Sequence, residues 1–463
     1  MSAGDATRPA GLKGQLGWVS YEMAGGPYYN MVRIFVFAPY FASIVVGDKI
    51  RGQELWGYIE SLSGFAVALL AAPLGAIAEA YGPRRPGIAL FTAIFLVSLC
   101  YLWTAAPHSD VAPIAVALII CAAVVEYAYL YHNSMLAFIA PPDRLGLISG
   151  FGYSANYLGT LLVIIPWLLF VGNAEVAPFG LNRTIGEDVR IVGPISAAWF
   201  LLCAIPFFLY TPDVPRRGPS IFSALASGMQ SLARTISNAR YYSNIVRYLI
   251  ARMIYYDGLV ATYTFTGIFA AGIFGWSAAK VAVYGLSVFS ILVFAGVLGG
   301  LIDALIGSKR TILLGLAMTM LSITFSLGLA PDHILFVTHI SASQNAVGIP
   351  FIGPLLNSLG FHLLTEQALI LSGVIGGVFL GPSLASSRTM MARLAPKTMM
   401  AEFFGLYFLT GKATSFVAPL AIAFVTHITQ DQRIGFGVVL IFILLGFLLL
   451  LGVREKRAES HAS

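Results

Sequence analysis

Long apolar runs are the feature that most constrains what this chain can fold into. Twelve stretches of about 20 residues or more carry little charge and are bounded by charged residues, glycine or proline. About 20 apolar residues in a helix span the hydrocarbon core of a bilayer. Only 10% of the residues are charged and 58% are hydrophobic, whereas about a quarter are charged in a soluble domain. The sequence therefore predicts an all-α integral membrane protein with twelve transmembrane helices.

The twelve predicted spans form two groups of six, separated by a polar linker. Their approximate ranges are 18–46, 55–79, 87–106, 111–133, 145–171, 191–210, 245–274, 278–306, 311–329, 365–387, 402–426 and 433–453. We expect a tail at 1–15, a six-helix bundle at 16–211, a linker at 212–243, a second bundle at 244–453 and a tail at 454–463. Apolar residues at near-helical spacing in the linker predict an amphipathic helix at the membrane surface.

The positions of lysine and arginine predict the orientation. Cytoplasmic loops of membrane proteins carry an excess of both residues. With the N-terminus inside, 18 of the 27 basic residues lie in inner segments, six in outer segments and three within spans. We therefore expect both termini in the cytoplasm and the long loop at 330–364 on the outer side.

An internal repeat links the two groups of spans. After the second span and after the eighth, the same order occurs: a glycine, an acid, a second glycine and two basic residues. The members are Gly75, Glu79, Gly82, Arg84 and Arg85, and then Gly299, Asp303, Gly307, Lys309 and Arg310. Glycine permits a tight turn, and basic residues suit the inner membrane surface. The repeat predicts gating loops at equivalent places in two halves.

Several short motifs along nearly the whole chain accompany this repeat. They are LGWVSYE at 16–22, VFAPYF at 36–41, APPDR at 140–144, SGFGY at 149–153, YDG at 256–258, AEFFG at 401–405 and GK at 411–412. The repeated loop resembles the signature of the major facilitator superfamily, and the motifs resemble its vacuole-effluxer-like branch of permeases. The resemblance implies two six-helix halves that rock around a central cavity. It also implies transport of amino acids or related metabolites.

The first span departs from the pattern usual in that branch. Gly25 and Gly26 stand where the branch usually has Asn and Ser, which removes two candidate ligand-contacting side chains. In the seventh span Tyr256 replaces an Asn.

Acidic residues inside the predicted spans are candidates for proton coupling. Asp257 lies near the middle of the seventh span, Glu126 in the inner half of the fourth and Glu22 toward the inner end of the first. A charge in hydrocarbon is costly, and a buried carboxyl group binds a proton more readily than an exposed one. The alternative is a structural ion pair or a side chain that reaches the headgroups. Glu60, near the outer end of the second span, fits this alternative better.

Three basic residues within spans, Arg33, Arg252 and Lys412, need partners for the same reason. Each could hold a substrate carboxylate. Alternatively, Lys412 or Arg252 neutralises Asp257 in a latch that opens during rocking. Polar residues of the first and seventh spans complete the candidate substrate-binding set: Tyr28, Tyr29, Asn30 and Tyr256.

No nucleotide-binding motif, nucleophile cluster or metal-ligand spacing is recognisable, so we expect neither an enzyme nor a cofactor or metal site. His108 and His132 stand at membrane edges and are expected on the surface. The sequence predicts a monomeric, proton-coupled secondary transporter of a small polar solute in a bacterial plasma membrane. The alternative is a non-transporting protein of the same fold that delivers a pigment or lipid to membrane complexes.

Overall fold

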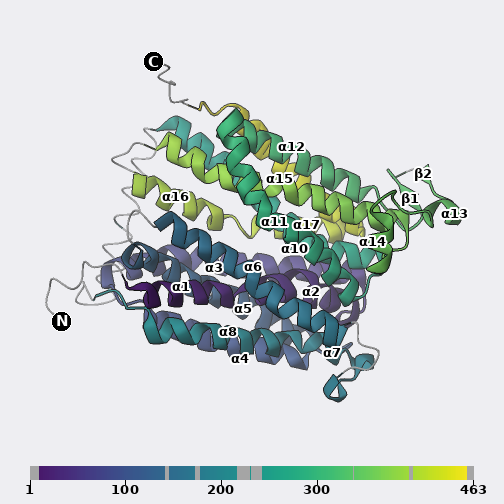
Figure 1. Cartoon of the computed structure of the whole chain (residues 1–463), viewed down its shortest axis with the longest axis horizontal. Coiled ribbons are helices and arrows are strands. Elements are labelled where there is room, and N and C mark those ends of the chain that lie inside the picture. Colours follow the sequence, from purple (N-terminus) through teal and green to yellow (C-terminus); the bar gives the residue numbers. More distant parts are fainter. Residues whose placement is uncertain are drawn as a thin grey trace. The chain divides into compact units, whose positions relative to one another are not determined.

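The computed structural model describes residues 10–140, 145–172, 178–215, 230, 242–336, 338–395 and 400–455. They divide into two compact units, unit 1 (Met1–Arg234) and unit 2 (Thr235–Ser463). Most of the predicted linker, with its amphipathic helix, lies outside the described residues. Figure 1 shows that each unit is built almost wholly of helices.

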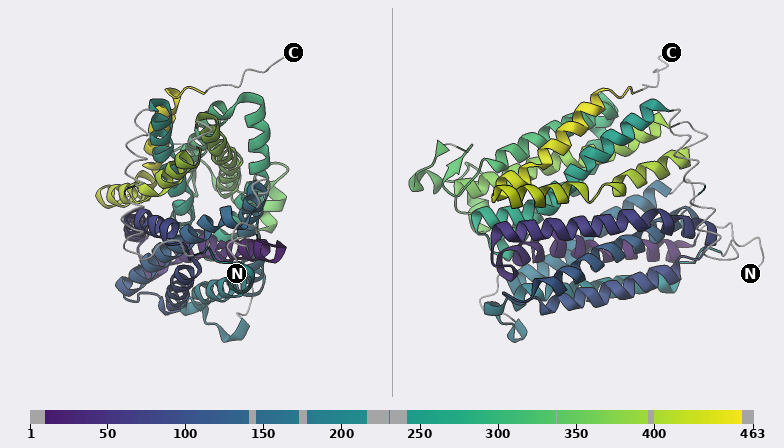
Figure 2. Two further views of the ribbon diagram at one scale, coloured as in Figure 1. Left: turned by 90° about the vertical axis from the view of Figure 1, so that its left-hand side faces the viewer. Right: turned by 180° about the vertical axis from the view of Figure 1, so that it is seen from behind.

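Unit 1 consists mainly of long helices that lie side by side (Figures 1 and 2). Its α-helices are α1 (Leu12–Ala24), α2 (Phe37–Tyr40), α3 (Lys49–Tyr81), α4 (Arg85–Tyr101), α5 (Val111–Ile139), α6 (Leu145–Trp167), α7 (Glu187–Arg190) and α8 (Val192–Tyr210). Its π-helical segments are η2 (Tyr28–Phe35), η3 (Phe41–Val45) and η5 (Leu168–Gly172), and its short 3-10 turns are η4 (Leu102–Thr104), η6 (Pro178–Gly180) and η7 (Arg183–Ile185). α1 packs against α6 and α8, and α5 packs against α3 and α4.

The first predicted span is not one regular helix. α1 ends before Gly25, and Pro27, which has no backbone N–H, precedes the π-helical η2. Pro39 lies in α2, between η2 and η3. A π-helical turn changes the direction in which side chains point, and such turns are frequent at functional sites. The irregular backbone thus directs four of the predicted site residues: Tyr28, Tyr29, Asn30 and Arg33.

Unit 2 contains ten helices and one small hairpin among its described residues. The helices are α10 (Ser243–Phe274), α11 (Ala278–Ile306), α12 (Ser308–Leu327), α13 (Ala342–Asn345), α14 (Gly353–Ser358), α15 (Leu364–Leu394), α16 (Met400–Ala413), α17 (Val417–Thr429), α18 (Gln432–Gly437) and α19 (Val439–Leu451). Strands β1 (His333–Ile334) and β2 (Thr338–His339) pair antiparallel. α15 packs against α11 and α12, and α10 packs against α19.

The helix lengths agree with a multi-pass membrane protein. Ten helices among the described residues are long and apolar enough to cross a membrane, and Ala278–Ile291 within α11 is a shorter apolar helix. The remaining predicted span corresponds to the interrupted stretch from α1 to η3. Large apolar side chains on these helices are exposed, among them Leu69, Val97 and Leu209. In a bilayer, such side chains contact lipid.

The long loop predicted on the outer side has structure of its own. It holds the β1–β2 hairpin, α13 and α14. In Figures 1 and 2 these elements lie beyond the ends of α12 and α15. The chain between these two spans therefore forms a small folded lobe at one end of unit 2.

Glycines of the sequence motifs permit close contacts between helices. A Cβ added at Gly17 would lie 2.8 Å from the carbonyl oxygen of Pro206 in α8. A Cβ added at Gly258 would lie 2.8 Å from the Cβ of Phe442 in α19. A real Cβ atom does not approach other heavy atoms this closely, so no side chain would fit at either position. The absence of a side chain lets α1 pack closely against α8, and α10 against α19.

Candidate functional site

The first candidate group of unit 1 is an ion pair between η2 and α3. Arg33 Nε donates a hydrogen bond to Glu60 Oε1 at 3.1 Å, and Nη2 contacts the other carboxylate oxygen. The side chain of Glu60 is 6% exposed and that of Arg33 is 18% exposed. This bidentate arrangement matches the planar guanidinium to the planar carboxylate. Arg33, predicted to bind an anion, therefore already has a carboxylate partner within its own unit.

A second acid lies beside Tyr29. The hydroxyl of Tyr29 donates to Glu126 Oε1 of α5 at 3.2 Å. The guanidinium of Arg33 lies 5.8 Å from the centre of the Tyr29 ring. The Tyr28 ring packs edge-on against the Tyr29 ring. One cation and two acids are thus gathered around η2. A single bound proton would make this group of charges neutral.

Asn30 makes its contacts inside unit 1. Its Nδ2 donates to the carbonyl oxygen of Gly26 at 3.0 Å and to Oγ1 of Thr160 in α6 at 2.7 Å. Asn30 is 2% exposed and Tyr28 is 1% exposed. In this conformation both side chains support the packing of η2 against its neighbours.

The two glycines that depart from the family pattern make room for polar groups of other helices. A Cβ at Gly25 would collide with the hydroxyl of Tyr129, and a Cβ at Gly26 with the carbonyl oxygen of Asn156. The Tyr129 hydroxyl donates to the carbonyl oxygen of Tyr21 at 3.1 Å. Asn156 Nδ2 donates to the carbonyl oxygen of Glu22, also at 3.1 Å. Polarity missing from α1 is therefore supplied by α5 and α6.

His132 is buried, which corrects the expectation that it lies on the surface. It is 0% exposed and stacks between the rings of Trp18 and Tyr21, with both centroid distances at 4.6 Å. Its Nδ1 lies 3.3 Å from Glu22 Oε1, an ion-pair distance without hydrogen-bond alignment. His132 lies 114 positions from Trp18 in the sequence, so only tertiary packing brings this imidazole to α1 and to its predicted coupling acid.

Arg252 is the central cation of unit 2. Its guanidinium carbon lies 3.6 Å from the centre of the Tyr407 ring and 4.7 Å from that of Tyr256. Nη1 donates to the carbonyl oxygen of Tyr407 at 2.7 Å and to Oγ1 of Thr410 at 3.3 Å. Arg252 is 5% exposed, and its buried Nε has no hydrogen-bond partner among the residues the structure describes. Within that same part of the chain, no carboxylate pairs with this guanidinium.

Gly411 explains how α16 accommodates this arginine. A Cβ added at Gly411 would lie 3.2 Å from Nη1 and 3.3 Å from Nη2 of Arg252. Such contacts are tighter than most that a real Cβ makes, so a side chain here would press on the guanidinium. The glycine of the GK motif therefore provides space for Arg252. Sequence reasoning named Arg252 and missed Tyr407, because no pattern in the sequence pairs residues 155 positions apart.

Asp257 has a backbone partner. Its Oδ2 accepts a hydrogen bond from the backbone N–H of Ala418 at 3.2 Å, in the first turn of α17. A carboxylate is favourably placed at a helix N-terminus, where backbone N–H groups lack helical partners. Asp257 is 4% exposed, whereas Lys412 lies exposed on α16. The latch between these two residues stays a prediction.

The repeated loop of unit 1 is tied to the end of the sixth span. The backbone N–H of Arg84 donates to Asp213 Oδ1 at 2.8 Å, and the N–H of Arg85 contacts the same carboxylate at 3.3 Å. The Arg85 guanidinium also donates to the carbonyl oxygen of Phe208 in α8. Asp213 thus caps the start of α4. The backbone of Gly82 has φ of 109°, which favours glycine at this turn.

The loop of unit 2 has the same arrangement with an added ion-pair network. Glu455, which follows the twelfth predicted span, accepts hydrogen bonds from the N–H groups of Ser308 and Lys309 at 3.0 and 3.2 Å. Arg393 joins Glu455 to Asp303, with N–O distances of 2.7 and 2.8 Å. In both units, therefore, an acid that follows the sixth span of the unit caps the start of its third span, which is α4 in unit 1 and α12 in unit 2. Neither acid belonged to the predicted repeat, although both follow a span end by a few residues.

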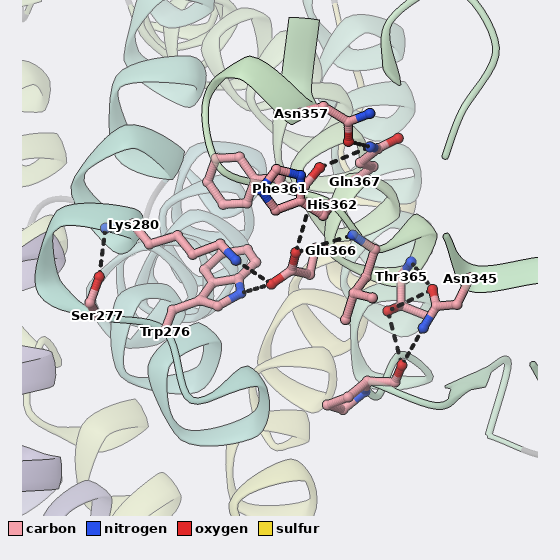
Figure 3. Close-up of polar contacts among 12 residues, drawn as sticks. Trp276, Ser277, Lys280, Asn345, Asn357, Phe361, His362, Thr365, Glu366 and Gln367 are labelled. Carbon is pink, nitrogen blue, oxygen red and sulfur yellow. Dashed lines mark hydrogen bonds and ion pairs between the residues drawn. The ribbon is translucent and has the colours of Figure 1, made fainter. Parts of the chain in front are cut away.

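Sequence reasoning also missed an acid at the end of unit 2 that carries the β1–β2 lobe. Glu366, in the first turn of α15, accepts hydrogen bonds from Lys280 Nζ at 2.5 Å and from Trp276 Nε1 at 2.8 Å (Figure 3). The backbone N–H of His362 donates to the same carboxylate at 3.1 Å. These contacts join the start of α11 to the start of α15. The signal for this site was an acid at the second position of the predicted span 365–387, in the first helical turn where a capping carboxylate belongs.

Known proteins are similar to this chain along most of its length. The family described as vacuole effluxer Atg22 like matches residues 140–463. An uncharacterized MFS-type transporter, YxiO of Bacillus subtilis, is 22% identical over 95% of this chain and 94% of that protein. Autophagy-related protein 22 of Yarrowia lipolytica and that of Kluyveromyces lactis are each 24% identical, over 68% and 69% of this chain. The chain matches only 51% and 60% of the length of these two fungal proteins.

Solved transporters share the fold. A POT family transporter in complex with 5-aminolevulinic acid has a TM-score of 0.64 over 97% of this chain and 98% of that chain, at 14% identity. A D-xylose-proton symporter has a TM-score of 0.62 over 95% of each chain, at 13% identity. Identities this low establish the fold alone, which is the predicted major facilitator fold.

Proposed function

We infer the function from the premise that this chain belongs to the vacuole effluxer Atg22 like family. It is a multi-pass membrane transporter of the major facilitator type. We propose that it is a secondary active transporter that moves a small polar solute by alternating access, coupled to protons. The expected solute is an amino acid or a related metabolite, and the expected location is a bacterial plasma membrane with both termini in the cytoplasm.

The burial of Arg252 and its lack of a carboxylate partner among the described residues are what support the proposed class of substrate. Arg252 is 5% exposed, and no carboxylate in the described part of the chain pairs with it. Keeping its guanidinium charged in such a buried place costs free energy. Arginine binds carboxylates through two parallel hydrogen bonds, and Nε of Arg252 is still available for one of them. The proposed solute therefore carries a carboxylate that completes this site. In unit 1, by contrast, Glu60 already fills the same role for Arg33.

Discrimination between a carboxylate and its amide tests the assignment of Arg252. Amino acids and related metabolites are screened by thermal shift on the purified full chain, and each stabilising compound is compared with its neutral amide. We expect the carboxylate to bind at least tenfold more tightly. Arg252→Met should remove this preference, and Arg252→Lys should keep only part of it, because a lysine lacks the planar fork.

Arg247→Met is the matched control for that experiment. Arg247 lies on the same helix as Arg252 but is exposed, and its Nη1 donates to the carbonyl oxygen of Gly452. This variant should keep the carboxylate preference of the wild type. Equal binding of carboxylate and amide by the wild type, or an unchanged preference in Arg252→Met, would contradict the proposal.

Proton coupling is tested in liposomes with and without a pH gradient. We propose Asp257, Glu22 and Glu126 as the coupling candidates because each is an acid within a spanning segment. Asp257→Asn should abolish gradient-driven accumulation and retain counterflow exchange, which needs no net proton movement. Normal accumulation by this variant would move the assignment to Glu126 or Glu22. A protein that binds no solute and drives no flux would instead support the assembly role.

A further inference from the structure

We propose that the hairpin between α12 and α15 binds a divalent transition-metal ion through Asp332, His333 and His339. One ligand atom from each of these residues lies within 4.8 Å of the other two. The site lies in the folded lobe beyond the ends of α12 and α15 and does not depend on the proposed transport function.

Strand pairing creates the site. His333 of β1 and His339 of β2 are direct partners in the antiparallel register. Side chains of directly opposed residues lie on the same face of a hairpin, close enough to touch. The two imidazole rings have centroids 3.9 Å apart, and Asp332 Oδ1 lies 2.8 Å from His333 Nδ1. The two histidines are six positions apart in the sequence, and the pairing of β1 with β2 brings them together.

The distances suit a metal ion without movement of the backbone. Zinc binds histidine nitrogens and carboxylate oxygens at about 2.0–2.2 Å, which places tetrahedral ligand atoms roughly 3.4 Å apart. The three ligand atoms lie within 4.8 Å of one another and need to move closer by little more than 1 Å, which rotation of the two exposed side chains, Asp332 and His339, supplies.

The backbone around the ligands is held in place on both sides. The N–H of Ile340 donates to the carbonyl oxygen of Asp332 at 3.0 Å. The carbonyl oxygen of Pro331 accepts hydrogen bonds from Asn345 Nδ2 and Thr365 Oγ1, whose side chains converge in Figure 3. Thr365 belongs to α15, so the first ligand follows a residue that is fixed to a spanning helix. Such preorganisation lowers the entropy lost on binding.

The ligand set selects the kind of metal. Imidazole nitrogens favour zinc, copper, nickel and cobalt, whereas magnesium and calcium favour oxygen ligands. Three protein ligands leave coordination positions open for water. Arg433 lies within electrostatic range of Asp332 and opposes a bound cation, although its Nη1 donates to the carbonyl oxygen of Leu327. Arg433→Gln should therefore strengthen metal binding.

Calorimetric titration of the tag-free full chain with NiCl2 and ZnCl2 tests the site, with MgCl2 as the negative ion. We expect one transition-metal ion per chain and no heat specific to magnesium. His333→Ala and His339→Ala should each weaken nickel binding at least tenfold. His427→Ala is the matched control, because His427 is an exposed histidine of the same unit, and it should bind nickel as the wild type does.

Electron paramagnetic resonance of the copper-loaded chain gives a second readout. Two nitrogen couplings are expected in the wild type and one in His339→Ala. Thermal unfolding of the metal-free variants verifies that they are folded, as expected because His339 is exposed and His333 is 31% exposed. An unchanged stoichiometry and affinity in the double variant His333→Ala/His339→Ala would overturn the proposal, as would a wild type that binds magnesium and nickel equally.

Discussion

Both units hold a mostly buried arginine in their first helical stretch, but they give it different partners. In unit 1 the Arg33 guanidinium faces the carboxylate of Glu60 in two parallel contacts. In unit 2 the Arg252 guanidinium lies against the Tyr407 ring and donates to a backbone carbonyl. A carboxylate neutralises the cation, whereas ring faces and carbonyl dipoles only stabilise it. Related helices in two halves of one fold thus carry different chemistry, and only unit 2 retains a net cation at this place.

The geometry of α10 explains why its own acid does not neutralise Arg252. Asp257 follows Arg252 by five residues on the same helix. Residues five apart diverge by about 140° around a helix axis, so their side chains point to different neighbours. Arg252 reaches α16, and Asp257 reaches the start of α17. One helix therefore supplies an acid and a base to two separate contacts.

The largest stability effect should come from Glu60→Ala. Removing the acid leaves a mostly buried guanidinium without its partner, and breaking a buried pair costs about 3–5 kcal/mol. Equilibrium unfolding in mixed micelles measures this loss. The double variant Arg33→Met/Glu60→Ala should recover much of it, since neither charge remains. Additive losses in the double-variant cycle would show that the two side chains do not interact and would remove one half of the comparison.

Arg252→Met should cost less, about 1–2 kcal/mol, through the lost hydrogen bond and ring contact. No buried acid is left unpaired among the described residues, and methionine fills the space between the tyrosine rings. The same unfolding measurement applies. A loss as large as that of Glu60→Ala would reveal a carboxylate partner for Arg252 and would break the contrast between the units.

A smaller effect is expected at Asp257. Asp257→Ala leaves the N–H of Ala418 without its acceptor and should cost about 1 kcal/mol. Asp257→Asn keeps an oxygen acceptor and should cost a few tenths of that amount, roughly the loss of charge at a helix terminus. Comparison of the two variants by unfolding separates the hydrogen bond from the charge. Equal losses would mean that the charge, and not the Ala418 contact, stabilises this region.

The smallest effects should come from the acids that cap the third helix of each half. Asp213→Asn and Glu455→Gln retain an acceptor for the backbone N–H groups, so each should lose only about 0.5 kcal/mol. Glu455→Gln should lose more than Asp213→Asn, because Arg393 pairs with Glu455 as well. Unfolding at low and high salt measures the difference, which salt should reduce. A larger loss for Asp213→Asn would show that the pair between Arg393 and Glu455 adds nothing to the stability of the loop in unit 2.

Much of the candidate site could be identified from residue type and depth, because a charge inside an apolar span is costly wherever it lies. Asp257, Arg252, Arg33 and Glu126 stood out on that ground. Their partners could not be identified, since each comes from another helix. Glu60 was expected to form a structural ion pair or to reach the headgroups, and it pairs with Arg33, a partner that the sequence did not identify.

The repeated loops show the same division. Glycine and basic residues at fixed spacing marked both turns. Asp213 accepts a hydrogen bond from a backbone N–H 128 residues away, and Glu455 from one 147 residues away. No local sequence pattern reaches that far. His132 was placed wrongly for a related reason: the edge of an apolar run says little about which face of the helix packs inward.

The sequence by itself determined the class of this protein, its division into two halves and the approximate positions of its spans. Apolar length and the distribution of charges decide these properties, because the bilayer accepts only helices whose backbone groups are satisfied within the segment. Only the tertiary structure decided which charges pair, which glycines make room for Tyr129 and Arg252, and which histidines meet across the hairpin. Those contacts join residues of different helices or strands, and contact between distant residues depends on how the elements pack rather than on what each segment prefers alone.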